Sequence, residues 1–343
     1  PSRGAFSYSS SNTSVASVQG RTVTVVGEGV AVLTVSQAAA GGFAAGTAQL
    51  RLVVSQRPDP SRDPGVIANV QAQVDASVRF ASAQQANIRD RLRQVRSGSN
   101  ASSNQLSLSY SGGNDLPSVS VPMSRLGGDA LPALPAGWGM WASGSASYGT
   151  GAGHSSYDFR TDGLSVGVDR AFGDQFLFGV AGSIGRNNSD MEGSDARVKS
   201  DQRSLAAYGL WRGGDHLFVD GVIATGTLDF DTRRWSADAD AFAQGTRDGD
   251  QWFGSLAVGY EHRNAGMTLT GYGRIEASRS TLDSYRENGA GLYDLVYREQ
   301  VVRNSAVALG LEGAYLPADP EARVRPFWSI EYRQALDDKA MRT

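Results

Sequence analysis

The sequence contains no cysteine, and this absence removes several kinds of site. A chain without thiols has no disulfide framework, no thiolate metal site and no cysteine nucleophile. Three histidines are present, but none is spaced from another histidine or from a carboxylate as metal ligands usually are. We therefore predict that the chain holds no metal or cofactor and has no catalytic residues.

Long apolar runs and a strong net charge are also missing. No stretch approaches the ~18 consecutive apolar residues of a membrane helix, which argues against a helical membrane protein. The 32 basic and 35 acidic side chains leave a net charge of −3, so nucleic acid is not an expected partner. Mean hydropathy is −0.30. That value still permits a transmembrane barrel, because barrel strands alternate apolar and polar residues.

Residues 1–56 show the pattern of short β-strands. Four segments alternate β-branched residues with small or polar ones and are separated by glycines: 14–18, 22–26, 30–35 and 48–54. This alternation predicts a small β-sandwich. The run SSNTSVASVQGRTVTVVGEGVAVLTV further resembles the bacterial Ig-like modules of invasin-type surface proteins. The resemblance implies that residues 1–56 are a truncated, exported Ig-like passenger module.

A linker and a long helix follow. Three prolines and four charges mark residues 57–64 as the linker, where Asp63 and Pro64 supply an N-cap and a first helical residue. Apolar residues then recur at helical spacing, which predicts a helix over 65–98 that is roughly 48 Å long. One face is rich in Val and Ala and the other in Gln and Arg. This composition suits a polar pore, although for the helix taken alone a surface helix or a coiled-coil segment would be the better interpretation.

Residues 99–136 and 137–343 differ sharply in pattern. The first segment is rich in Ser, Asn, Gly and Pro, which predicts an irregular connector or a small hairpin, with one strand at 105–110. From residue 137 onward about nine long segments alternate large apolar residues with small or charged ones. Leu164, Val166 and Val168, for example, alternate with Ser165, Gly167 and Asp169. This period of two predicts long β-strands with one apolar face.

Alternation alone does not separate a membrane barrel from a soluble barrel or sandwich, because both have one apolar face. Two features favour lipid on the apolar side. The opposite face holds small residues beside isolated charges, and aromatic residues lie toward strand ends, as in interfacial girdles. These aromatic residues are Trp211, Trp252, Tyr260, Tyr315, Trp328 and Tyr332. We therefore favour a barrel that crosses a membrane.

The connections between strands are unequal in length, as they are between the two sides of outer-membrane barrels. Short turns are predicted at 171–174, 213–215 and 264–266, and long polar excursions at 187–201, 229–250 and 280–303. We expect the short turns to face the periplasm and the excursions to face outside. In the second excursion, the pairs Asp238/Asp240 and Asp248/Asp250 would suit Ca²⁺ only if a loop folded around them, and a solvated loop is the simpler interpretation.

Several segments follow one another in a distinctive order: the helix VQAQVDASVRFASAQQANIRDRLRQVR, the strand GWGMWASGSASYG, then DGLSVGVDRAFGDQFLFGVAGSIG and SLAAYGLWRGGDHLFVDGVIATGTLDFDTRR. In this order they resemble the autotransporter β-domain over residues 66–343. The resemblance implies an all-β fold: a transmembrane antiparallel β-barrel with a pore-spanning α-helix, here preceded by the Ig-like β-sandwich. Barrels of this family have twelve strands and a terminal aromatic residue. The last three strands and that residue look absent here.

The resemblance also implies the function. The chain is expected to be an outer-membrane translocator and anchor, not an enzyme, that exports its own N-terminal passenger to the cell surface and keeps the helix in the barrel lumen. The implied partners are outer-membrane lipid, the barrel assembly machinery and the passenger, whose ligand the sequence leaves open. The alternative is a surface adhesin whose Ig-like module is the binding element.

We finally predict what holds the helix. If the apolar strand residues face lipid, the two-residue period of strands turns six carboxylates toward the pore. These carboxylates are Asp169, Asp220, Glu261, Glu276, Glu312 and Glu331. The last third of the helix carries Arg89, Arg91, Arg93 and Arg96. We therefore predict charge-assisted contacts between these arginines and the barrel wall.

Overall fold

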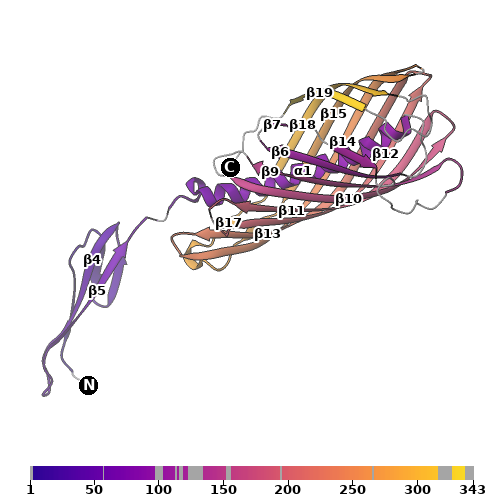
Figure 1. Cartoon of the computed structure of the whole chain (residues 1–343). Helices are drawn as coiled ribbons and strands as arrows, with labels where there is room; N and C mark the ends of the chain where they lie inside the picture. Colours follow the sequence, from indigo (N-terminus) through magenta and orange to yellow (C-terminus); the bar gives the residue numbers. More distant parts are fainter. Residues whose placement is uncertain are drawn as a thin grey trace. The chain divides into compact units, whose positions relative to one another are not determined.

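The computed structural model describes residues 3–56, 58–96, 103–112, 114–115, 119–122, 134–151, 156–193, 195–264, 266–315 and 327–336. The chain divides into two compact units, Pro1–Asp63 and Pro64–Thr343 (Figure 1).

The first unit contains two small antiparallel sheets. The three-stranded sheet has the order β1 (Phe6–Ser10), β4 (Gly29–Gln37) and β5 (Gly46–Val54), and the hairpin consists of β2 (Ala16–Gln19) and β3 (Thr22–Val25). Their core is small: the buried side chains that cluster are Val15, Ala16, Ala31 and Leu33. Strands β2 to β5 lie where the sequence alternates, and the Ig-like assignment stays a prediction.

The second unit begins with the long helix α1 (Pro64–Arg96), after the short helix η1 (Pro60–Arg62). Its 33 residues correspond to about 50 Å. Buried side chains occur along its whole length, from Val66 to Val95. None of the helices in the described part of the chain is long and apolar enough to cross a bilayer.

An antiparallel sheet curls around α1 (Figure 1). Nine of its strands are neighbours in chain order: β9 (Trp138–Gly151), β10 (Tyr157–Phe172), β11 (Phe176–Met191), β12 (Arg197–Gly213), β13 (Leu217–Ser236), β14 (Ala241–Arg263), β15 (Met267–Leu282), β18 (Gln300–Tyr315) and β19 (Phe327–Ala335). Helix α1 packs against β9 to β15. The predicted all-β architecture, with a helix inside a curled antiparallel sheet, is confirmed.

The segment predicted as an irregular connector or a small hairpin contributes strands to the β9 edge of this sheet. Strand β6 (Ser103–Gly112) pairs with β9 in parallel, and the short β7 (Asn114–Asp115) and β8 (Val119–Pro122) pair with β6. The strand predicted at 105–110 lies within β6. An unpaired edge exposes backbone N–H and C=O groups, so β6 satisfies the groups that β9 would otherwise expose.

The two faces of the sheet follow the predicted alternation. Large apolar residues face outward, with Phe178 58% exposed and Ile330 70% exposed. Outward aromatic residues ring the end where the short turns lie, and they are Trp138, Phe172, Phe176, Trp211, Tyr260, Tyr315 and Trp328. The inward residues are small, polar or packed against α1. An apolar outer face and an interfacial girdle are typical of a barrel wall in lipid.

Two of the three predicted long excursions are wrong. Segments 187–201 and 229–250 belong mostly to strands, and the turns between those strands cover only 192–196 and 237–240. Strand β13 has 20 residues and β14 has 23, whereas about 9–11 suffice to cross a bilayer. The strands therefore continue into water, where polar outward residues such as Asp248 and Asp250 replace apolar ones. Asp248 and Asp250 thus lie on a strand and not in a loop, whereas Asp238 and Asp240 lie in the turn 237–240.

The third excursion is a true connection between β15 and β18. It contains the short pair β16 (Tyr285–Arg286) and β17 (Val296–Tyr297), with the helix η3 (Gly291–Tyr293) between them. Among the connections that the structure describes, the predicted inequality of the two ends holds mainly because of this one.

Candidate functional site

The contact between α1 and the inner wall changes character along the helix. In the first half, four small or aromatic residues recur every four positions, which places them on one helical face. They are Ala68, Ala72, Ala76 and Phe80. They pack against inward apolar residues of the strands, including Tyr157, Leu228 and Phe230. Gly185 gives Phe80 its space, because a Cβ atom there would lie 2.8 Å from the ring.

The middle of the helix is held by neutral hydrogen bonds. Asn87 Nδ2 donates to Ser165 Oγ over 2.8 Å, and Ser143 Oγ donates to Asn87 Oδ1 over 3.1 Å. The Ser204 hydroxyl donates to the side-chain carbonyl of Gln84. All five side chains are buried. These bonds favour one register of the helix, because each replaces a bond to water, although Gln84 Nε2 is buried without a partner among the described residues.

Arg91 and Asp169 form the most buried ion pair of the site. Arg91 Nε and Nη2 donate to the two carboxylate oxygens, each over 2.8 Å, and the side chains are 1% and 0% exposed. Tyr208 Oη donates to Asp169 Oδ2 over 2.9 Å, and Trp141 Nε1 donates to Tyr208 Oη over 2.6 Å. The two charges are thus paired bidentately, and the carboxylate has a further donor.

Arg93 and Arg96 reach the opposite part of the wall. Arg93 binds Glu312 through two donors, Nε over 3.2 Å and Nη2 over 3.0 Å. Arg96 Nη1 lies 2.7 Å from Asp220 Oδ2, and Arg96 Nε lies 3.9 Å from Glu261 Oε2. Arg93 is 37% exposed, but Arg96 only 9%. The ion pairs of the helix therefore range from partly exposed to solvent to almost fully buried.

Arg89 pairs with Glu276, which also accepts from Arg274 and Arg333 of the wall. Glu331 contacts Arg274 instead of the helix, with Arg274 Nη2 at 2.8 and 2.7 Å from its two oxygens. The intervening strand β18 has Gly310 at this level, so side chains of β15 reach across it. The structure brings every other predicted carboxylate to an arginine of α1.

Sequence reasoning missed contacts in the middle of the helix and at its C-terminal end. Arg79 donates to Thr161 and Asn187 and lies 4.0 Å over the Phe159 ring. These partners are neutral, so a charge pattern gives no signal for them. At the last turn, Arg212 Nη2 donates to the Val95 carbonyl over 2.5 Å, and Arg263 donates to that of Arg96 over 2.9 Å. These bonds satisfy carbonyls that a helix end leaves free.

Another missed contact joins the outer connection to α1. Arg247 donates to three carbonyls, those of Leu282, Asp283 and Arg298, and to Gln73 Oε1 over 3.0 Å. The connection 283–299 is thereby tied to the first half of the helix.

A buried ion pair stabilises that connection. Arg234 Nε and Nη2 lie 3.0 and 2.7 Å from the oxygens of Glu287, and both side chains are almost fully buried. The Tyr285 and Tyr297 rings stack 4.5 Å apart, and Tyr297 Oη donates to Glu287. Burial raises the pKa of both tyrosines, and the nearby carboxylate raises it further. The connection is therefore a folded element.

Little space remains beside the arginines. A cavity of about 20 Å³, enough for one water molecule, lies among Arg89, Arg93, Arg96, Asp220 and Glu312. No cluster of three metal-binding side chains occurs among the described residues.

A model of one protein family matches the C-terminal part of the chain. The family model described as "Autotransporter beta-domain" matches residues 138–343. One curated relative, an uncharacterised protein encoded in the trpE–trpG intergenic region of Pseudomonas putida, is 26% identical over 192 residues, which are 54% of this chain and 31% of that protein. The chain thus spans about a third of that relative's length.

Two solved structures are similar. The translocator domain of the autotransporter NalP from Neisseria meningitidis has a TM-score of 0.49 and 20% identity, covering 58% of this chain and 67% of that one. The β-domain of the Bordetella autotransporter BrkA has a TM-score of 0.41 and 18% identity, covering 58% and 82%.

Proposed function

The chain belongs to the autotransporter β-domain family, and from this premise we propose that α1 is the plug that closes the pore once the passenger has left it. The matched segment is a transport module, an outer-membrane translocator and anchor that serves export to the cell surface. The proposal concerns what the helix does in that module and how the passenger is held.

The observation that carries the proposal is the arginine-rich last third of α1 against the inner wall. Arg91 and Arg96 are almost fully buried between the helix and the strands, and each has a carboxylate partner. A polar-faced helix placed in this way fills the lumen. It also tethers whatever precedes Pro64 to the barrel. The N-terminal unit is then the attached part of the passenger, and insertion of the barrel would need the assembly machinery of the outer membrane.

The same contacts support an orientation. The last turn of α1 is bound by Arg212 and Arg263, beside the short turns 214–216 and 264–266. Its first half is bound near the turns 192–196 and 237–240 and the folded connection 283–299. In outer-membrane barrels short turns face the periplasm. The helix then enters from the cell surface and ends near the periplasm.

Protease accessibility tests this orientation. A single protease site is inserted in the turn 237–240 of one variant and in the turn 214–216 of another, and protease is added to intact cells that make the full-length protein. We expect cleavage at the first site only, and cleavage at the second after the outer membrane is permeabilised. Cleavage at 214–216 in intact cells would reverse the proposed orientation.

A further inference from the structure

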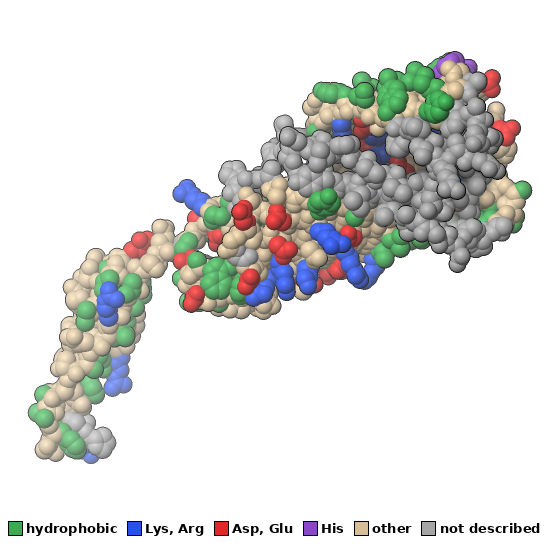
Figure 2. Space-filling view, in the orientation of Figure 1, with side chains coloured by type: hydrophobic (Ala, Val, Ile, Leu, Met, Phe, Trp, Pro, Cys, Tyr) green, Lys and Arg blue, Asp and Glu red, His purple; other side chains and the backbone are tan. Residues whose placement is uncertain are grey.

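The connection 283–299 joins β15 to β18 where the wall continues beyond lipid. On the face shown in Figure 2, charged side chains gather over the outward side of the strands toward the end where β17 lies. The outward residues of β14 at this end are polar, as Thr246, Asp248 and Asp250 are. Water therefore surrounds this part of the sheet, and polar groups of the connection can exchange their protein partners for water.

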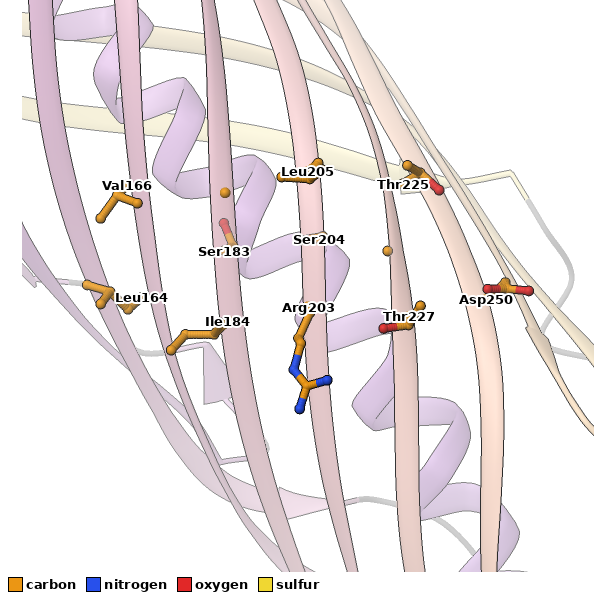
Figure 3. Close-up of a pocket in the computed structure, with 12 residues that line it drawn as sticks. Leu164, Val166, Ser183, Ile184, Arg203, Ser204, Leu205, Thr225, Thr227 and Asp250 are labelled. Atoms are coloured by element: carbon orange, nitrogen blue, oxygen red, sulfur yellow. The ribbon is translucent and has the colours of Figure 1, made fainter.

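The connection folds over the inner side of the hairpin that β13 and β14 form. Helix α1 lies behind the wall strands, on the side away from the exposed Thr227 and Asp250 (Figure 3). Because side chains alternate along a strand, Arg234 of β13 and Arg247 of β14 point to the side of α1, and each is only 2% exposed. Arg234 pairs there with Glu287 of the connection. The connection therefore lies on the lumen side of the wall, at the end from which α1 starts.

Close fitting holds the connection against β14. Backbone bonds run in both directions between Gln244 and Asn288, each over 2.8 Å. The Tyr285 ring lies where Gly245 has no side chain, since a Cβ atom there would be 2.7 Å from the ring. The Arg247 guanidinium lies 5.5 Å over the same ring. We call residues 283–299 the strap, because they are bound along the wall and bridge two strands across the start of the helix.

Arg247 binds the strap and the helix with one guanidinium group. Its donors reach the carbonyls of residues 282, 283 and 298 over 3.2, 2.6 and 3.0 Å, and Nη1 donates to Gln73 Oε1 over 3.0 Å. Gln73 is fully buried, and its Nε2 donates to Asn69 Oδ1 over 2.6 Å. Loss of an acceptor is costly for a buried cation. A seated helix therefore favours the closed strap, and a closed strap favours the seated helix.

We propose that the strap closes over α1 when the helix is seated, and that Arg247 couples the two events. A passenger segment in the lumen does not present Gln73 at this position. The strap therefore stays open while the passenger crosses, closes behind it, and is then held by the buried pair of Arg234 and Glu287. The inference rests on the proposed role of α1 as the plug and on the proposed orientation.

Hydrogen–deuterium exchange of the purified full-length protein in phospholipid nanodiscs tests the coupling. The reporters are the amides of Asn288 and Leu295, which donate to the Gln244 carbonyl and the Glu287 carboxylate. Gln73→Leu removes the acceptor on the helix and should accelerate exchange of the strap by about tenfold, as expected for the loss of one hydrogen bond to a charged group.

Two matched variants of the same helix accompany this measurement. Gln73→Glu keeps an acceptor for Arg247, so the strap should stay protected as in the wild type. Gln71→Leu is the control, because Gln71 donates to Asp75 of the helix and not to the wall. Unchanged strap exchange in Gln73→Leu, or equal acceleration in Gln71→Leu, overturns the inference.

The reverse direction is tested from the strap. Glu287→Gln removes the counterion of buried Arg234 and should accelerate exchange of the strap by about tenfold or more. Coupling predicts that the first half of α1, residues 66–80, also exchanges about fivefold faster. Glu299→Gln, an exposed position next to the strap's end, should change neither. Faster exchange of the strap with an unchanged helix would show that the strap closes independently of α1.

Failure of the plug itself gives a different result. If α1 is not held in the lumen, the amides of residues 89–96 exchange rapidly in the wild-type protein. Protected amides at 89–96 together with an uncoupled strap overturn the present inference and leave the plug intact.

Discussion

The two ends of α1 meet the same wall by different means. The first half relies mainly on the shape of a stripe of alanines and Phe80 against apolar side chains, with hydrogen bonds of Arg79 and Gln73 beside it. The last third relies on arginines, each paired with a carboxylate of a different strand. The stability from close packing does not depend on salt concentration, but it falls when a substitution leaves a cavity or adds an atom. Exposed ion pairs respond most to salt, whereas buried ion pairs respond most to the loss of one partner.

The largest effect is expected from Asp169→Asn. The substitution leaves the buried guanidinium of Arg91 without its counterion, which costs about 3–5 kcal/mol of the free energy of unfolding. Urea titration of the protein refolded in phospholipid vesicles measures it. The matched control is Asp174→Asn, in an exposed turn, where a change within about 0.5 kcal/mol is expected. Equal losses in the two variants would mean that the pair is not buried in lipid vesicles.

A smaller loss of the free energy of unfolding is expected when an extra methyl group is introduced against the first half of α1. Gly185→Ala places a methyl group 2.8 Å from the Phe80 ring and should destabilise the protein by about 1–3 kcal/mol. The same titration at 0.1 M and 1 M NaCl should give the same loss, because no charge is involved. Gly182→Ala, on the outward face of the same strand, has room for the methyl group and should not destabilise the protein. A neutral Gly185→Ala would show that the helix does not pack tightly there.

The smallest effect is expected from Arg93→Gln. This side chain is 37% exposed in its pair with Glu312, so the pair contributes about 0–1 kcal/mol. The Debye length falls to about 3 Å at 1 M salt, so the loss should vanish there. A loss of stability that persists at 1 M NaCl would show that the Arg93 pair is buried from solvent, as the Arg91 pair is.

Much of the site could be predicted because it follows from local periodicity. A strand repeats every two residues, so Asp169 and Glu312 must face the pore if Leu164 and Leu311 face lipid. The apolar spacing of α1 is equally local. Together these two patterns predicted which arginines and carboxylates share the lumen, without any knowledge of which strand each arginine meets.

What could not be predicted depends on contacts between distant strands. Glu331 binds Arg274 because Gly310 leaves space between β15 and β19. The residue pattern of a single strand does not predict this contact. A polar run such as 229–250 predicts a loop, but a strand that extends into water loses its apolar face and keeps its ladder of hydrogen bonds. The contacts of Arg79 could not be predicted from the distribution of charges, because its partners are neutral.

The conductance of the full-length protein in planar bilayers tests the plug most directly. Arg89, Arg91, Arg93 and Arg96 are replaced by Gln, with Asp169→Asn in the same chain so that the most buried carboxylate does not lose its cation. Gln is a good helix former, so α1 itself should persist. The control replaces Arg160, Arg186 and Arg303, which face outward, by Gln. We predict a higher conductance in the first variant than in the wild type or the control. Equal conductance in all three folded proteins would contradict the claim that charge holds the helix in the pore.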